Sequence, residues 1–138
     1  MELSIFTITI VSILSGLLSS MWVWSSSWYD IRLSINDFYM SILMTGWMFF
    51  FHGITMKYVK YIWIGVIVII FSLIVIRLQL FVTPDQYLLG MIPHHSMAVL
   101  MSEKIIDKYG PHILDKLPLN IVHSQNREIV KMKRLLIT

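Results

Sequence analysis

The stretch that decides the fold is YIWIGVIVIIFSLIVI, residues 61–76, a run with no charged side chain. Arg77 follows it, and the apolar sequence LQLFV then continues to Val82. A helix needs about 20 apolar residues to cross the hydrocarbon core of a bilayer, with a usual range of about 17–25. Residues 61–82 reach that length if the long Arg77 side chain extends its guanidinium to the membrane interface. This segment therefore predicts a transmembrane helix.

Two further segments without a charged residue precede it, residues 3–24 and 38–56, and both have the length of a span. The whole chain agrees, because 57% of its 138 residues are hydrophobic and 14% are charged, against about 25% charged residues in an ordinary soluble domain. We predict a membrane domain over residues 1–82 with three spans, at about 3–24, 38–56 and 61–82. Aromatic residues gather near the span ends, as in an interfacial belt: Trp22, Trp24, Trp28, Tyr29, Tyr58, Tyr61 and Trp63.

The orientation follows from the short connection between the second and third predicted spans. Lys57 and Lys60 lie there without an acidic residue, and lysines in short loops favour the cytoplasmic side. Residues 25–37 and everything after residue 82 are then outside. Glu2 is the only early charge and no basic region precedes the first apolar run, so we expect that run to be retained as a span. The chain is thus expected to be a multi-pass membrane protein with an extracytoplasmic C-terminal region. It has no cysteine and hence no disulfide.

Residues 83–138 are predicted to form a helical hairpin. Thr83 is a good N-cap, Pro84 suits the first helical position, and Gln86 completes a capping box. The end of this first helix is expected at Tyr109, because the next residue, Gly110, can take the left-handed conformation that closes a helix.

A second helical region is expected from Pro111 to about Ile137, interrupted or kinked at Pro118. A hairpin of this size buries too little surface to be stable alone. It should therefore need a partner, either a second copy of the chain or the membrane helices.

The first helix of the hairpin carries MIPHHSMAVLM, residues 91–101, with two adjacent histidines. Pro93 has no N–H to donate to Leu89, and a kink there can turn neighbouring side chains toward one point. At 100° per residue, His95 lies about 40° from Met91. Helical spacing places five residues on one stripe: Met91, His94, Ala98, Met101 and Ile105. Both imidazoles and two thioethers can therefore face one pocket.

The second helix offers a matching stripe. Gln125 and Glu128 lie on it among apolar residues, and buried polar groups need partners, for which the two histidines are natural. His123 lies about 160° from Gln125 and His112 sits in the turn, so both are left out of the site. The stripe comprises Ile121, Gln125, Glu128, Met132 and Leu135.

MIPHHSMAVLM followed by IVHSQNREIVKMKRL resembles the DUF305 family, a ferritin-like helical group. The resemblance covers residues 85–136 and is nearest to a short branch with membrane spans ahead of the motif. It implies a metal-binding or metal-handling hairpin, since some members are associated with copper binding and copper tolerance in the periplasm. The residues that match the family's two motif segments are Met91, Ile92, Pro93, His94, His95, Ala98, Val99, Met101, Gln125, Glu128, Ile129 and Met132.

We expect a soft-metal site centred on the two histidines. Thioethers select Cu(I) and imidazole suits copper in both oxidation states, so copper is the expected metal, although another transition metal is possible. A di-iron site is less favoured because no Glu-x-x-His motif is present. The expected ligands are His94, His95, Met91, Met101 and Met132, with Gln125 and Glu128 holding the imidazoles from outside.

Methionines and a histidine also recur at every fourth position of the second predicted span: Met40, Met44, Met48, His52 and Met56. One interpretation is a path for a soft metal across the bilayer. The plainer one is helix packing, since methionine is at home in a buried or lipid-facing span. His52 is a polar group in an apolar run, which marks a functional or helix-contact position.

Two functions remain open. The first is a membrane-anchored metal-binding protein. The second is a membrane structural or assembly protein whose histidine, glutamine and glutamate side chains form only a buried polar network. No nucleophile or phosphate-binding loop is present, so an enzyme is less favoured, and nucleic acid is not an expected partner. Many relatives carry the motif twice and complete a four-helix unit, whereas one copy supplies two helices. We therefore expect a homodimer through the hairpin, anchored in the lipid bilayer.

Overall fold

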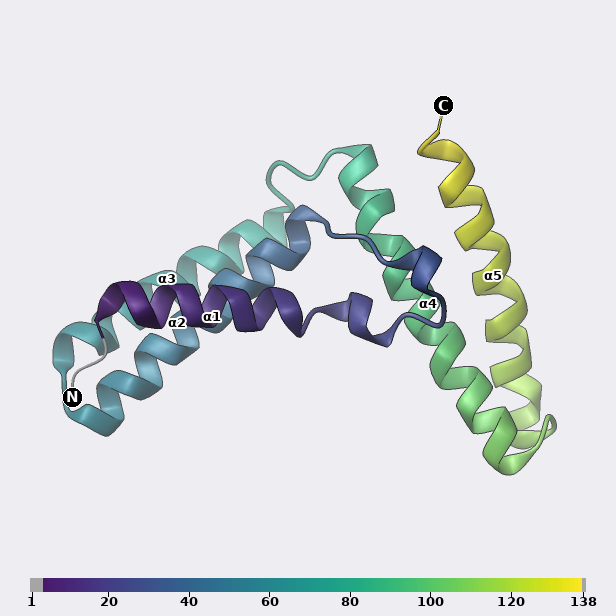
Figure 1. The fold of residues 1–138 in the computed structure, drawn as a ribbon, viewed down its shortest axis with the longest axis horizontal. Helices are drawn as coiled ribbons and strands as arrows, with labels where there is room; N and C mark the ends of the chain where they lie inside the picture. The colour runs from purple at the N-terminus through teal and green to yellow at the C-terminus, as the bar shows by residue number, and fades with distance from the viewer. Residues whose placement is uncertain (1–3, 138) are drawn as a thin grey trace. The chain divides into compact units, whose positions relative to one another are not determined.

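The computed structural model describes residues 4–137, and all of its regular structure is helical (Figure 1). No β strand occurs among these residues, which confirms the predicted all-α class. Leu3, where the first span was predicted to begin, and Thr138, the end of the predicted hairpin, lie outside the described residues.

The chain forms two compact units. The first contains the residues up to Ser20 together with Ile35–Val82. The second contains Met21–Ser34, called the connector below, together with the chain from Thr83 onward. The predicted membrane domain had grouped the connector with the spans. The structure groups it instead with the C-terminal helices, because the connector packs against one of them.

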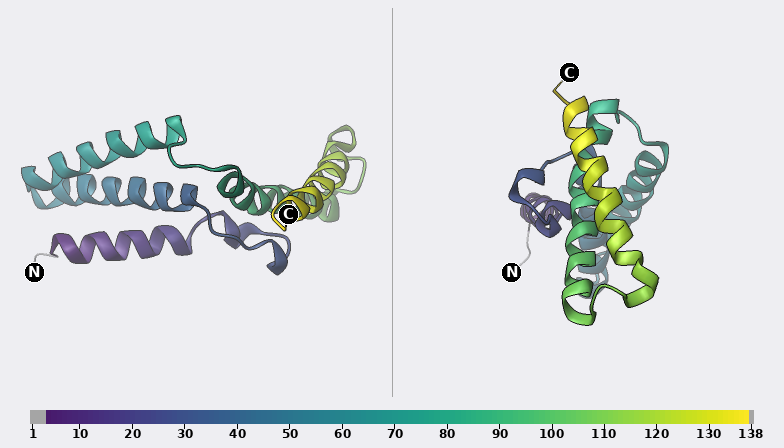
Figure 2. Two further views of the ribbon diagram at one scale, coloured as in Figure 1. Left: turned by 90° about the horizontal axis from the view of Figure 1, so that it is seen from above. Right: turned by 90° about the vertical axis from the view of Figure 1, so that its right-hand side faces the viewer.

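Three helices make up the first unit: α1 (Ile5–Leu18), α2 (Ile35–Met56) and α3 (Val59–Leu78). Helix α2 packs against both of the others, and α2 and α3 run antiparallel on either side of a tight turn (Figure 2). Ser4 caps α1, since its hydroxyl accepts a hydrogen bond from the Thr7 N–H at 3.1 Å. Glycines lie where α2 and α3 approach most closely, at Gly46, Gly53 and Gly65.

Two of the predicted spans differ from the helices observed. Helix α1 ends at Leu18, and Met21–Trp24 forms a separate 3₁₀-helix, η1. The Ser20 hydroxyl donates to the Leu17 carbonyl at 3.3 Å, and such serine side chains compete with helical hydrogen bonds. Helix α3 ends at Leu78 rather than continuing to Val82, because Gln79 takes a left-handed conformation with φ of 49°.

Among residues 4–137, two segments are long and apolar enough to cross a membrane, judged by length and composition: Ile5–Trp24 and Val59–Leu78. Helix α2 has 22 residues, the length of a span. Its sequence is less apolar than theirs because polar residues such as Thr45 and His52 interrupt it. Its place in a membrane therefore depends on arguments other than composition.

The second unit is built on two long helices, α4 (Pro84–Tyr109) and α5 (Leu117–Leu135). They lie side by side as a hairpin (Figure 2). The predicted start of α4 is confirmed, since the Thr83 hydroxyl accepts a hydrogen bond from the Gln86 N–H at 3.3 Å. The helix continues without interruption through Pro93.

The turn of the hairpin differs from the prediction in two respects. Gly110 has φ 88° and ψ 165°, so it is extended with a positive φ rather than left-handed helical, a conformation that suits glycine. The second helix does not begin at Pro111. A short 3₁₀-helix, η3 (Ile113–Lys116), comes first, and three residues in it have positive φ: Leu114, Asp115 and Lys116. Pro118 then falls in the first turn of α5, where proline leaves no hydrogen bond unmade.

The core of the second unit lies between α4 and α5. Ile92 and Val99 from α4 meet Ile129 and Met132 from α5, and all four are buried. The α4 face that packs on α5 is thus displaced by one residue, about 100°, from the predicted stripe. Of that stripe, Met91 and Ala98 are half-buried, whereas His94, Met101 and Ile105 are exposed.

Candidate functional site

Helix α4 places the two adjacent histidines in different surroundings. His95 is 9% exposed, whereas His94 is exposed. Successive residues on an α-helix point about 100° apart, so only one of the two rings can face α5. Their ring centroids are 6.1 Å apart, with planes inclined by 58°. The pair therefore combines one sheltered and one accessible imidazole.

Glu128 of α5 approaches the sheltered histidine. Its Oε2 lies 3.2 Å from Nδ1 of His95, and its side chain is 54% exposed. The two atoms form an ion pair only when the imidazole is protonated, and Nδ1 has no hydrogen-bond partner among the described residues. The expectation that Glu128 would contact a histidine is met by His95 alone.

Burial dominates the titration of His95. Desolvation lowers the pKa of its imidazole below the ordinary 6.5, and the charge on nearby Glu128 offsets this only in part. His94 adds a smaller lowering of the pKa, because two cationic rings would repel each other. His95 is consequently neutral near pH 7, the form in which imidazole accepts a metal ion.

The methionines expected as ligands differ in their burial. Met132 is buried in the core, Met91 packs against that core half-buried, and Met101 is 54% exposed. Gln125 is half-buried on α5. In the part of the chain that the structure describes, no three histidine, cysteine, aspartate or glutamate side chains are close enough to hold a metal ion.

The ladder of methionines in α2 faces outward from the first unit. Met40, Met44, Met48 and Met56 are all exposed. His52 is half-buried beside Tyr61, with ring centroids 5.4 Å apart. Its Nε2 is buried and makes no hydrogen bond within residues 4–137.

Sequence reasoning missed a buried polar cluster between the connector and the hairpin. Asp30 lies at the end of η2 (Trp28–Asp30) and is 5% exposed. The Ser96 hydroxyl donates to Asp30 Oδ2 at 2.8 Å, and the Lys133 ammonium pairs with Oδ1. One acid in a loop gives no local signal of such contacts, since its partners lie far along the chain.

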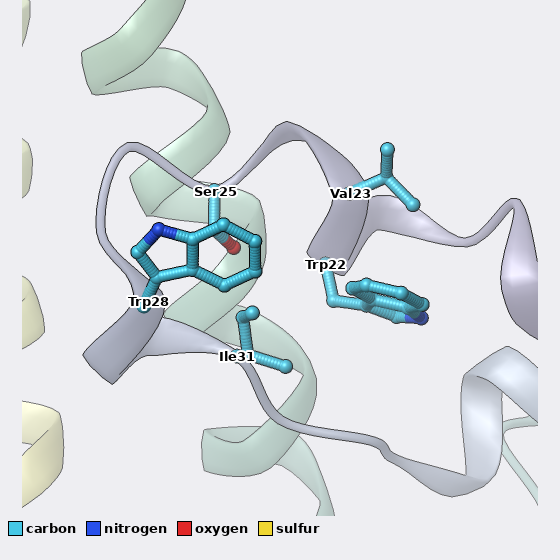
Figure 3. Close-up of a pocket in the computed structure, with 5 residues that line it drawn as sticks. All are labelled: Trp22, Val23, Ser25, Trp28 and Ile31. Atoms are coloured by element: carbon cyan, nitrogen blue, oxygen red, sulfur yellow. The ribbon is translucent and has the colours of Figure 1, made fainter.

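A pocket of about 140 Å³ opens within the connector (Figure 3). Its walls are Trp22, Val23, Ser25, Trp28 and Ile31. The Ser25 hydroxyl oxygen is buried and has no hydrogen-bond partner in the described part of the chain. Of the aromatic residues predicted to form an interfacial belt, Trp22 and Trp28 thus line a small hollow in the connector.

The comparisons with known proteins place these features in a wider group. The family model described as "Domain of unknown function (DUF305)" matches residues 81–136. The "Uncharacterized protein L153" of Acanthamoeba polyphaga mimivirus is 42% identical over 137 residues, covering 96% of this chain and 90% of that protein. The similarity therefore extends over helices α1 to α3 as well as the hairpin. No solved structure matches this chain.

Proposed function

This chain belongs to the DUF305 family, and we propose that it is a membrane-anchored metal-binding protein whose site is centred on His94 and His95. The observation that carries the proposal is the pair itself, with ring centroids 6.1 Å apart. Metal–imidazole bonds are about 2 Å long, which puts each ring centre about 3 Å from a shared ion. The separation is therefore within reach of one shared ion once the exposed His94 ring turns toward His95, and two imidazoles form an arrangement open to Cu(I).

Thioethers would complete the site. Met91 lies one turn before His95, and Met101 lies two turns after His94, so each histidine has a methionine on its own side of α4. Methionine has a flexible, unbranched side chain, and the exposed Met101 can change rotamer at little cost. Met132 comes from α5 on the sheltered side. Thioethers and imidazoles together favour copper over harder metal ions.

Removing both histidines is expected to abolish most copper binding. The double variant His94→Ala/His95→Ala should lower the apparent Cu(I) affinity by more than about 100-fold, because even residues that only support ligands account for about 10–100-fold. Competition titration with a Cu(I) chelator under reducing conditions measures this. Affinity should also fall with acid, since imidazole binds metal only when neutral. The lowered pKa of His95 moves that loss below pH 6.5.

The matched control is His112→Ala/His123→Ala, which removes two exposed histidines outside the site. This variant should bind Cu(I) as the unaltered protein does. Failure of the unaltered protein to take up copper, or equal binding by the His94/His95 variant, would contradict the proposed site.

The contact between His95 and Glu128 favours a second candidate function, in a membrane structural or assembly protein. Under that proposal the contact fixes how α4 and α5 pair, and the hairpin joins a second copy to complete four helices. The exposed face with His94, Met101 and Ile105 would then be available to the partner. Metal analysis of the purified protein separates the two candidates.

Three membrane spans are part of the proposal, and the connector supports them. It contacts α4 through Ser26 and Asp30, so the connector and the hairpin lie on one side of the membrane. If α3 crosses, its start near Val59 lies on the other side. The chain between Ser34 and Val59 must then cross too, and α2 is the segment that does so. Lys57 and Lys60 favour the cytoplasmic side for the connection between α2 and α3, and the hairpin would then lie outside.

Cysteine labelling tests this topology, and the absence of native cysteine makes the experiment clean. Single cysteines are introduced at Ser27, Lys60 and Asn126. An impermeant reagent should label the cysteines at positions 27 and 126 from one side of the membrane and the cysteine at position 60 from the other. Lys60 and Asn126 are both exposed, so access does not limit the reaction there. Labelling of all three from one side would rule the arrangement out.

A further inference from the structure

The buried cluster at Asp30 joins three segments of the second unit. Ser96 of α4 has no exposed surface, and its hydroxyl accepts a hydrogen bond from the Ser26 N–H at 2.9 Å while donating to Asp30. Lys133 of α5 pairs with the other carboxylate oxygen. Asp30 thus connects both helices of the hairpin at once, from a loop that continues directly into α1 and α2.

The contacts on α4 lie along one line. Ser96 and Glu103 are seven residues apart and point within about 20° of each other. Both accept hydrogen bonds from Ser26: the Ser26 N–H donates to the Ser96 hydroxyl, and the Ser26 hydroxyl donates to the Glu103 carboxylate at 3.2 Å. His95 points about 100° away from Ser96, toward Glu128. Helix α4 therefore has two buried faces, and fixing one of them fixes the other.

We infer that Asp30 is a positioning residue that docks the connector on the hairpin and sets the rotation of α4, so that His95 is sheltered against α5 and His94 is exposed. The effect of this positioning on metal binding rests on the proposed function, whereas the positioning itself does not. The inference stands on the shared geometry of Asp30, Ser96 and Lys133.

The energetics support a locking role for this cluster. Asp30's side chain is 7% exposed and that of Lys133 is 32% exposed. Removing one partner of a buried ion pair leaves the other charge without compensation, which costs far more than the pair contributes in place. In Asp30→Asn the amide can still accept from Ser96, but the ammonium of Lys133 loses its counter-charge. The connector should then undock more often.

Trypsin cleavage at Arg32 reports on the docking in the full chain held in mild detergent. Arg32 lies in the connector, where its guanidinium donates to the carbonyls of Tyr29 and Ile31. Cleavage there requires local opening, so Asp30→Asn should raise its rate by about tenfold or more. Cleavage at Arg127, within α5, serves as the internal reference for unfolding of the whole unit. The matched control is Asp107→Asn, an exposed aspartate on α4 that should change neither rate.

Carbethoxylation of the histidines, followed by mass spectrometry, reports on the positioning without any metal. His95 should react slowly in the unaltered protein and approach the rate of His94 in Asp30→Asn, while exposed His123 stays constant. An unchanged rate at Arg32 would overturn the docking role. Faster cleavage at Arg32 with His95 still protected would overturn the positioning role.

A milder variant distinguishes the loss of docking from a general loss of structure. If Arg127 is cut as fast as Arg32 in Asp30→Asn, the same two measurements on Ser96→Ala decide, because this change removes one hydroxyl and keeps the ion pair. The expected result is a smaller rise at Arg32 with His95 partly exposed. No rise at either residue in Ser96→Ala would count against the inference.

Discussion

The substitution Gly65→Val is expected to force α2 and α3 apart and to lower the free energy of unfolding of the first unit by about 3 kcal/mol, the upper end of the usual range for overpacking. A Cβ at Gly65 would lie 2.5 Å from the Phe50 nitrogen and 2.8 Å from the Gly46 carbonyl oxygen, closer than real Cβ atoms approach. Both neighbours are backbone atoms, which cannot rotate away. The two helices must therefore separate, and this disrupts the packing of the buried side chains Phe49 and Ile69.

Unfolding by SDS titration in mild detergent measures the effect, and Gly46→Ala is the comparison. A Cβ at Gly46 would meet the side-chain carbon Cγ1 of Ile69 at 2.9 Å and the Ile69 nitrogen only at 3.1 Å. Flexible side-chain atoms can move aside. Gly46→Ala should therefore lower the free energy of unfolding clearly less than Gly65→Ala, the same substitution at the other glycine. Equal stability of Gly65→Val and the unaltered protein would show that α2 and α3 do not pack as closely as described.

Local chemistry made parts of the fold predictable. Thr83 and Pro84 start α4 where the sequence predicts, because a cap and a helix-starting proline act within a few residues. The end of α4 at Tyr109 is predicted likewise from Gly110, although this glycine closes the helix with an extended, positive-φ conformation rather than the left-handed one. The end of α1 was less accessible, since Ser19 and Ser20 do not interrupt an apolar run strongly enough to distinguish an α-helix from the 3₁₀-helix that follows.

Contacts between residues far apart in the chain could not be predicted from the sequence. Asp30 lies 66 positions from Ser96, and nothing near it indicates a buried carboxylate. The connector was consequently treated as an interfacial loop rather than as a third layer on α4. Its docking covers the side of α4 that carries Ser96 and Glu103 and leaves His94, Met101 and Ile105 of the predicted stripe exposed.

The candidate site was predictable by residue type but not by direction. The adjacent histidines and Glu128 stand out in the sequence, and His95 does contact Glu128. The convergence of the methionines was inferred from one helical wheel, which gives angles on α4 but not the direction of α5. A stripe beginning at Met91 and one beginning at Ile92 have the same spacing and similar apolar content. Only the contacts of Ser96 and Val99 separate them.

This one-residue difference yields the second large effect, for Ile92→Ala. Ile92 has no exposed surface and packs against Val99, Ile129 and Met132. Truncating a fully buried isoleucine costs about 2–5 kcal/mol, from lost burial and from the cavity left behind. Amide hydrogen exchange in α4 and α5 of the full chain should accelerate accordingly, by more than about 30-fold if both helices open together.

The matched control is Ile105→Ala on the same helix. Ile105 belongs to the predicted stripe 91/94/98/101/105 but is 38% exposed, so less apolar surface is lost on its truncation and the cost should stay below about 1 kcal/mol. The ratio of the two effects decides which face of α4 meets α5. A larger effect at Ile105 than at Ile92 would restore the predicted stripe as the packing face. It would then turn His94 rather than His95 toward Glu128, and the sheltered and accessible members of the histidine pair would exchange places.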